Sequence, residues 1–140
     1  MTKNNSMRGV LAPVITPFDA DLRPDIDRLI RHCKWLMAQD CGLAVFGTNS
    51  EGTSLSVEEK IDIVDTLIDS GIDPQHLMPG TGCCSIIDTI RLTRHMAKRN
   101  CGGVLMLPPF YYKNVSADGL YRSIAEVIDQ VGDDRLRVHR

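Results

Sequence analysis

Residues 43–69 read LAVFGTNSEGTSLSVEEKIDIVDTLID and decide the fold. The apolar run at 43–46 has the length of a buried β-strand, and a polar loop bounded by glycines follows at 47–52. After this loop, apolar residues recur at steps of four, three and four, which places them on one face of a helix: Val57, Ile61, Val64 and Ile68. The stretch therefore predicts one strand–loop–helix unit.

The same unit recurs along the chain. Strands are expected at residues 10–15, 43–46, 77–79, 104–107 and 136–139, with starts about 27 to 34 residues apart, the length of a βα unit. The other expected helices carry three apolar stripes with the same spacing: Ile26, Ile30, Cys33 and Met37; Ile86, Ile90, Thr93 and Ala97; Leu120, Ile124, Val127 and Val131. Three lysines of the expected helices should lie on solvent faces: Lys34, Lys60 and Lys98.

Local signals agree with these boundaries. Ser56, followed by Glu59 three residues later, predicts a capping box, and Gly71 predicts the end of the same helix. No low-complexity segment or linker interrupts the pattern. We therefore expect a single domain over residues 1–140, with a flexible N-terminus at 1–8, four βα units and the start of a fifth strand.

Two α/β architectures accommodate this pattern. A flavodoxin-like open sheet closes with five strands near this length. A (β/α)8 TIM barrel needs about 250 residues, so the 140 residues would form about its first half. An open sheet should finish with a helix, whereas this chain finishes in the strand expected at 136–139, which favours a parallel half-barrel.

Composition limits the possible functions. Hydrophobic residues make up 43%, charged residues 24%, and the net charge of −2 offers no basic surplus for nucleic acid. No apolar run reaches the roughly 18 residues of a membrane helix, and residues 1–8 lack an apolar signal core, so we expect no membrane partner and a cytoplasmic location. Cysteines and histidines show no ligand spacing, so neither a metal nor a cofactor is expected. The cysteines are expected to be buried, reduced thiols: Cys33, Cys41, Cys83, Cys84 and Cys101.

The loops after the strands are the places to look for chemistry, because sites in βα folds form where strands end. In the 47–52 loop, glycines let backbone N–H groups converge, and Thr48, Asn49 and Ser50 add side-chain donors suited to a carboxylate or phosphate. A plain polar loop leading to the helix is the equally open alternative. After the fourth strand, prolines stiffen a segment that presents Tyr111, a side chain able to relay a proton, although packing or an oligomer contact would also account for it.

Four segments carry a resemblance to a known family. They are Gly9-Val10-x-x-Pro13-Val14-x-Thr16-Pro17-Phe18, Gly47-Thr48-x-x-Glu51, Pro79-Gly80-Thr81-Gly82 and Pro109-Phe110-Tyr111. In order and spacing they resemble the motifs of the dihydrodipicolinate synthase / N-acetylneuraminate lyase family, over the chain from about Gly9 to its end.

The resemblance implies a homotetrameric class I aldolase or lyase on a (β/α)8 barrel, which binds pyruvate or a related 2-oxo acid as a Schiff base on a lysine of the sixth strand. By the same resemblance, the 47–52 loop holds the substrate carboxylate through Gly47, Thr48, Asn49 and Ser50. Thr48 and Tyr111 are then the catalytic relay residues, and Tyr111 reaches into a neighbouring subunit's site.

The sequence departs from the family pattern in three ways. Asn49-Ser50 stands where the family has Thr-Gly, Phe110 stands where the family has a tyrosine, and the chain ends before the strand that would carry the lysine. Lys113 is the one lysine in a loop on the expected active-site side, where it should stay solvated. We therefore expect the chain to be a truncated lyase, inactive alone; the alternatives are a non-catalytic carboxylate binder and a self-associating barrel fragment.

Overall fold

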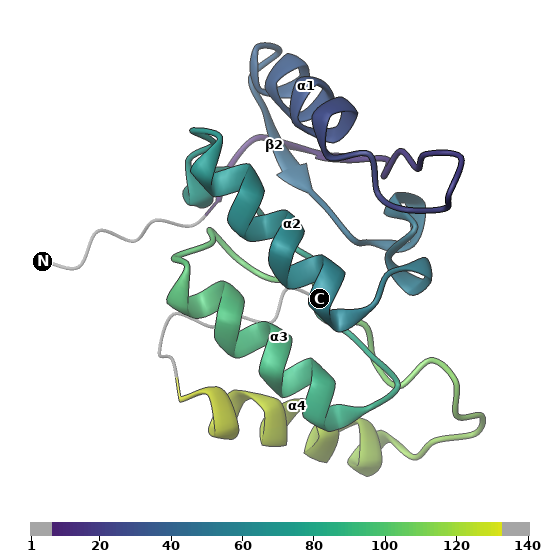
Figure 1. Ribbon diagram of the computed structural model, residues 1–140. Coiled ribbons are helices and arrows are strands. Elements are labelled where there is room, and N and C mark those ends of the chain that lie inside the picture. The colour runs from purple at the N-terminus through teal and green to yellow at the C-terminus, as the bar shows by residue number, and fades with distance from the viewer. Residues whose placement is uncertain (1–6, 133–140) are drawn as a thin grey trace, which may run out of the picture.

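The computed structural model describes residues 7–132. Figure 1 shows the elements of this part of the chain: β1 (Val10–Pro13), α1 (Ile26–Met37), β2 (Cys41–Ala44), the 3₁₀ turns Thr48–Ser50 and Gly52–Ser54, α2 (Val57–Asp69), the 3₁₀ turn Pro74–His76, α3 (Ile86–Lys98) and α4 (Ala117–Val131). The strand expected at 136–139 and residues 1–6 of the expected flexible N-terminus lie outside the described residues.

The order of the parallel segments distinguishes the two predicted architectures. β1 pairs with β2 in parallel, from Val10 opposite Cys41 to Pro13 opposite Ala44. The far edge of β2 meets the next segment through a parallel bridge between Leu43 and Leu77, and a bridge from Gly80 to Leu105 adds the fourth segment. A flavodoxin-like sheet places its first strand between the second and third. The observed order follows the chain, as in a barrel, and the open-sheet alternative is wrong.

The strand boundaries differ from those that the sequence predicts: β1 is shorter than the expected 10–15, and β2 is shifted toward the N-terminus. The strand expected at 43–46 is observed at Cys41–Ala44, because Phe46 has a left-handed backbone (φ 62°) that ends the extended run. The segments expected at 77–79 and 104–107 pair only through single bridges within the described residues. Pro79 lacks the N–H that a longer ladder would need, although its carbonyl accepts a hydrogen bond from Leu105 N–H at 2.8 Å.

Helix ends follow the predicted signals. Ser56 accepts a hydrogen bond from Glu59 N–H (3.1 Å), and the Glu59 carboxylate accepts one from Ser56 N–H (2.7 Å), which completes the predicted capping box of α2. The side chains of Ser85 and Ser116 also cap α3 and α4, by accepting hydrogen bonds from Asp88 N–H and Gly119 N–H. Gly71, just beyond α2, has φ 95°, a conformation that glycine adopts without strain.

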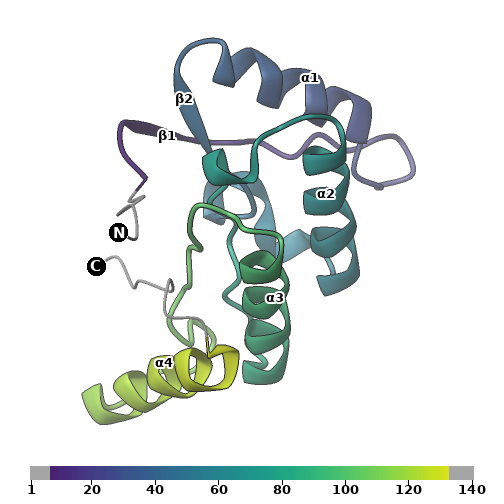
Figure 2. The ribbon, with the colours of Figure 1, turned by 90° about the vertical axis from the view of Figure 1, so that its left-hand side faces the viewer.

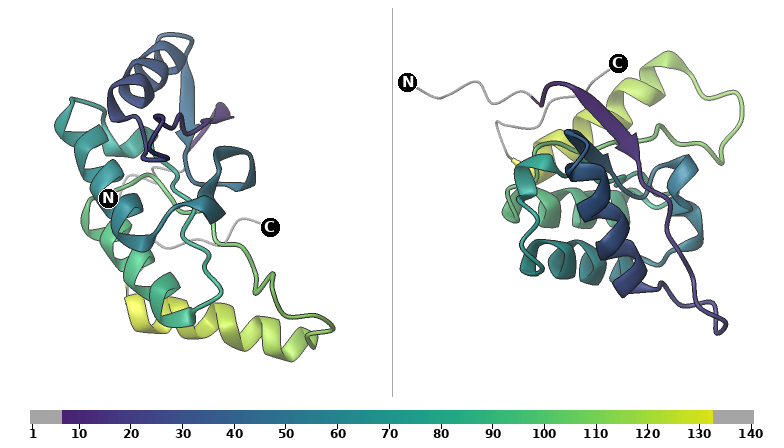
Figure 3. Two further views of the ribbon diagram at one scale, coloured as in Figure 1. Left: turned by 45° about the vertical axis from the view of Figure 1, so that its right-hand side comes forward. Right: turned by 90° about the horizontal axis from the view of Figure 1, so that it is seen from above.

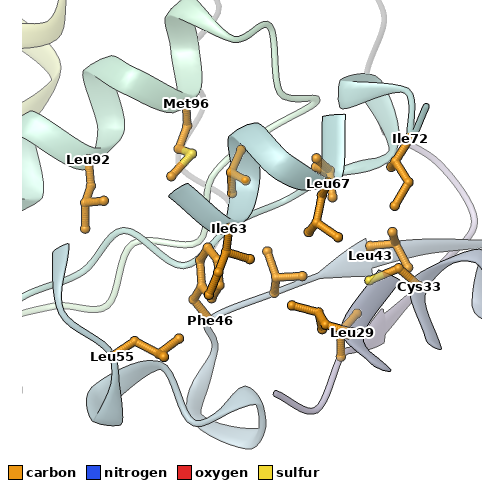
Figure 4. Packing of buried hydrophobic residues seen from close by; sticks show 14 residues of the cluster. Leu29, Cys33, Leu43, Phe46, Leu55, Ile63, Leu67, Ile72, Leu92 and Met96 are labelled. Carbon is orange, nitrogen blue, oxygen red and sulfur yellow. The ribbon is translucent and has the colours of Figure 1, made fainter. Parts of the chain in front are cut away.

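A single apolar cluster lies between the helices and the strand segments (Figure 4). Leu29 and Cys33 of α1 pack with Leu43 of β2 and with Ile63 and Leu67 of α2, and each is 2% exposed or less. Burying an aliphatic side chain of this size stabilises the fold by about 1.5–3 kcal/mol. The predicted apolar stripes therefore lie on the core side of the helices. The most deeply buried residues of a helix are not always those of its predicted stripe.

Two helices show this difference clearly. In α3 the predicted Ile86 is 37% exposed, whereas Leu92 and Met96 are fully buried. In α2 the buried face includes Lys60, which is 4% exposed, so its expected position on the solvent face is wrong. A pattern of steps of four and three residues fits two neighbouring faces of a helix equally well. The spacing alone therefore did not identify which face packs against the core.

The helices lie in chain order along an arc outside the strand segments (Figure 2). The opposite side of the strand segments has no helix from residues 7–132 over it, and Val10, Ile15 and Leu107 remain 66%, 55% and 42% exposed there or nearby. The loops that follow β1, β2 and the 104–107 segment project from one end of this arrangement (Figure 3). This end is where the predicted site residues occur.

Candidate active site

The 47–52 loop begins at a strained point of the backbone. Phe46 is buried and left-handed, and its carbonyl oxygen lies so close to Gly52 and Gly80 that a Cβ atom on either glycine would overlap it. Two glycines from different loops therefore allow the chain to turn at the end of β2. The N–H groups of Ser50 and Gly52 both donate to the Gly47 carbonyl, at 3.0 and 3.1 Å, and close the loop into a compact turn.

A hydrogen-bonded link to the loop after β1 fixes the 47–52 loop. Glu51 is left-handed (φ 54°), and its carboxylate accepts a hydrogen bond from Thr16 N–H at 2.8 Å. The Thr16 hydroxyl donates to the Ser50 carbonyl at 2.7 Å. The contact with Ser50 is buried and the contact with Glu51 is partly buried, and shielding from water strengthens a hydrogen bond. Thr16 was absent from the predicted site, although its place in the first family-like segment was a signal that could have found it.

The predicted carboxylate-binding residues divide into two kinds. The side chains of Thr48 and Asn49 are exposed at the tip of the first 3₁₀ turn, and Gly47 is half-buried below them. Ser50 is fully buried, and its hydroxyl donates to the Ala44 carbonyl at 3.2 Å. Thr48 and Asn49 are thus free to bind a ligand, whereas the Ser50 hydroxyl already holds the loop onto β2.

The segment with the predicted relay tyrosine is exposed. Tyr111 is 72% exposed and packs edge-on against Tyr112, with ring centroids 5.7 Å apart. No hydrogen bond joins Tyr111 to Thr48 in the part of the chain that the structure describes. Lys113, two residues beyond Tyr111 in the same segment, is exposed, as its loop position predicted. The loops that carry the two relay candidates project from the same end of the molecule (Figure 3).

The turn after the third strand segment is structural in this geometry. Thr81 is fully buried, and its hydroxyl is hydrogen-bonded to that of Thr93 on α3 at 3.0 Å. Gly82 lies against the backbone of Leu107, so that a Cβ atom would come within 2.6 Å of the Leu107 nitrogen. Among residues 7–132, no three His, Cys, Asp or Glu side chains gather as a metal site would require, and no helix is long and apolar enough to cross a membrane.

The class of protein follows from three features: parallel segments in chain order, helices outside them, and polar loops at the carboxyl ends of the strands. This chain is part of a (β/α)8 barrel, and its candidate site lies at the end of the barrel where sites of this fold usually form.

Known proteins identify the family. The model of the dihydrodipicolinate synthetase family matches residues 6–136. The 4-hydroxy-tetrahydrodipicolinate synthase of Symbiobacterium thermophilum is 33% identical over 124 residues, which are 86% of this chain and 42% of the relative. The chain belongs to the dihydrodipicolinate synthetase family, and it spans less than half the length of the curated relatives that it matches.

Solved structures show the same fold. Dihydrodipicolinate synthase from Agrobacterium tumefaciens superposes with a TM-score of 0.87 at 33% identity, over 90% of this chain and 44% of that one. A prophage protein of the family from E. coli K12, solved in complex with pyruvate, gives 0.77 at 27% identity, over 89% and 42%. The N-acetylneuraminate lyase of Proteus mirabilis gives 0.78 at 27%, over 91% and 44%. The expected family and barrel fold are confirmed, and family members are lyases and aldolases.

Proposed function

We propose that this chain supplies the carboxylate-binding and proton-relay part of a lyase or aldolase that acts on pyruvate, or on another 2-oxo acid, through a lysine Schiff base. The observation that carries the proposal is the 47–52 loop: Thr48 and Asn49 are exposed on a turn whose backbone is held by Glu51 and Thr16. A pyruvate complex of a related protein gives the substrate class independent support.

The residue types suit this chemistry. A carboxylate needs several oriented donors, and the Thr48 hydroxyl and Asn49 amide can provide them from a turn that is already rigid. A protonated imine is an electron sink that lets a bond at the adjacent carbon break, and the released proton needs a relay of hydroxyls. In this proposal Thr48 and Tyr111 form that relay, and the lysine belongs to sequence outside these 140 residues.

The exposure of Tyr111 bears on the assembly. A relay hydroxyl works only in contact with its partner, yet Tyr111 is 72% exposed. We therefore propose a homo-oligomer, a dimer or tetramer, in which Tyr111 of one protomer reaches the Thr48 hydroxyl of its neighbour. The proposal needs no resident cofactor or metal, and its location in the cell is expected to be the cytoplasm.

Borohydride trapping with pyruvate, read by intact mass, tests the proposal. The 140-residue chain should give no adduct, and a chimera continued with the C-terminal half of the Agrobacterium enzyme should give one adduct that requires Thr48. An adduct on the 140 residues alone, at Lys113 or elsewhere, would overturn the assignment of the lysine. Pyruvate-dependent thermal stabilisation of a chimera that cannot be trapped would instead identify a non-catalytic carboxylate binder.

A further inference from the structure

Two adjacent cysteines lie in the irregular turn that precedes α3. Cys83 and Cys84 connect the third strand segment to α3, which begins at Ile86. Cys84 is exposed and Cys83 is half-buried, so neither is the fully buried thiol expected from the sequence; Cys33, by contrast, is completely buried. Both thiols are reduced in the structure. Because adjacent cysteines share one turn, a reagent that reaches one thiol is also near the other.

A buried lysine lies beside this pair. Lys60 is 4% exposed as a whole residue, although its Nζ atom is not among the buried side-chain atoms of residues 7–132 that lack a hydrogen-bond partner. Burial raises the pKa of the Cys83 thiol above its ordinary value, while the charge of Lys60 acts in the opposite direction and lowers it. The Lys60 charge is therefore close enough to stabilise a Cys83 thiolate when one forms.

The turn also opens onto a pocket. Cys84 lines a cavity of about 520 Å³ together with Tyr112, Ser116 and Leu120, between the start of α3 and the start of α4. This space is large enough for a small organic molecule next to the Cys84 sulfur. The half-buried Cys83 is not among the residues that line the pocket. Access therefore favours Cys84 as the first thiol to react.

We propose that Cys83 and Cys84 form a reversible thiol modification site, in which a low-molecular-weight disulfide reacts first at Cys84 and is then displaced by Cys83 under the influence of the Lys60 charge. In the first step the Cys84 thiolate attacks one sulfur of the reagent; a mixed disulfide forms, and one thiol leaves. In the second step the Cys83 thiolate attacks Cys84 Sγ; the second thiol leaves. Two protein thiols are oxidised to one disulfide, the reagent is reduced to two thiols, and the two cysteine protons go to the departing thiolates.

Geometry makes the resulting bond easy to reduce. Disulfides ordinarily join residues with Cα atoms about 4.4–6.8 Å apart, whereas the Cα atoms of adjacent residues are about 3.8 Å apart. The Cys83–Cys84 bond would be strained, and strained disulfides are the labile ones. Forming it also requires the turn to move. Cys83 N–H donates to the Thr89 hydroxyl at 3.0 Å, and that hydroxyl donates to the Ser85 carbonyl at 3.1 Å. Oxidation should release the first of these contacts.

The experiment is a time course of the purified 140-residue chain with glutathione disulfide, read by intact mass and by peptide mapping of residues 83–84. Wild-type protein should pass through a transient glutathione adduct at Cys84 and finish with both thiols lost and no adduct. Cys83→Ser should stop at a stable adduct on Cys84, and Cys84→Ser should react at least about tenfold more slowly in this turn, because only the half-buried thiol remains. Dithiothreitol should restore the starting mass of the wild type.

Lys60 is tested separately from the thiols. Lys60→Met should slow the second step at constant pH, because loss of the positive charge lowers the fraction of Cys83 present as thiolate, while Lys60→Arg should retain most of the rate. A persistent adduct on wild-type Cys84 with Cys83 still free would overturn the proposal, as would modification of Cys41 in preference to Cys84. If Lys60→Met and the wild type had equal second-step rates, the role assigned to the Lys60 charge would be wrong.

Discussion

The Glu51 carboxylate accepts a hydrogen bond from the backbone N–H of Thr16 at 2.8 Å, and this contact spans 35 residues of sequence. It joins the loop after β2 to the loop after β1, next to the exposed side chains of Thr48 and Asn49. Glu51 achieves this with a left-handed backbone, a conformation that costs a non-glycine residue about 1 kcal/mol or more. The side-chain contact compensates for that cost, and it accounts for a glutamate at this point of the loop.

Removing the Glu51 carboxylate should therefore loosen the site. Glu51→Ala should lower the free energy of unfolding by about 1.5–3 kcal/mol, the value of a hydrogen bond to a charged group, as measured by urea denaturation. Glu51→Gln keeps an acceptor oxygen and should lose less. Glu51→Gly removes the same contact as alanine but relieves the left-handed strain, so it should be less destabilising than alanine by about 1 kcal/mol. Equal stability of the alanine variant and the wild type would contradict the structural role of this contact.

Thr48, Asn49 and Ser50 should separate ligand binding from stability. Thr48→Ala and Asn49→Ala change exposed side chains, so the free energy of unfolding should move by no more than about 0.5 kcal/mol. Ser50→Ala removes the buried hydrogen bond to Ala44 and should cost about 1 kcal/mol. Ligand binding is measured separately, as the thermal shift that pyruvate produces in the trappable chimera. Loss of the pyruvate effect in the Thr48 and Asn49 variants, at unchanged stability, is the expected result; a destabilised Thr48→Ala variant would show that the hydroxyl is structural.

The glycines around Phe46 give a steric test with a matched control. A Cβ atom at Gly52 or Gly80 would overlap the Phe46 carbonyl oxygen, so each alanine variant should lose about 3 kcal/mol of stability, or fail to fold. Gly47 has an extended backbone (φ −73°) and nothing within 4 Å of the position of a Cβ atom. Gly47→Ala should accordingly leave the free energy of unfolding nearly unchanged. Equal stability of all three variants would contradict the close contact of the Phe46 carbonyl oxygen with Gly52 and Gly80.

Much of this arrangement could be predicted from the sequence, because its signals are local. The Ser56–Glu59 capping box involves residues three apart, and it is present as predicted. The four family-like segments were sufficient to predict the family and the barrel, since their order and spacing carry more information than any one of them. Thr48 and Asn49 were correctly placed on an exposed loop, and their role in binding stays a prediction.

The features that the sequence did not reveal depend on distant contacts. Phe46 ends β2 early because its left-handed backbone fits between two glycines, one of them 34 residues away at Gly80. Lys60 is buried because α2 turns a neighbouring face toward the core, a difference that a spacing of four and three residues does not resolve. Exposure of Cys84 follows from the loop between the third strand segment and α3, and the composition of the chain gave no sign of it.

The buried Cys33 and the half-buried Cys101 should make stability depend on pH in the alkaline range. Burial raises the pKa of Cys33 from 9.0 to about 12, and the pKa of Cys101 rises to about 12 mainly for the same reason. The unfolded chain ionises these thiols near pH 9, whereas the folded chain keeps them protonated, so their contribution to stability is complete below pH 9 and is lost as the pH rises toward 12. Urea denaturation at a series of pH values should show the free energy of unfolding falling across this window, less steeply in Cys33→Ala. At pH 8, iodoacetamide should label Cys84 in the native protein, and Cys33 only after unfolding; native labelling of Cys33 would contradict its burial.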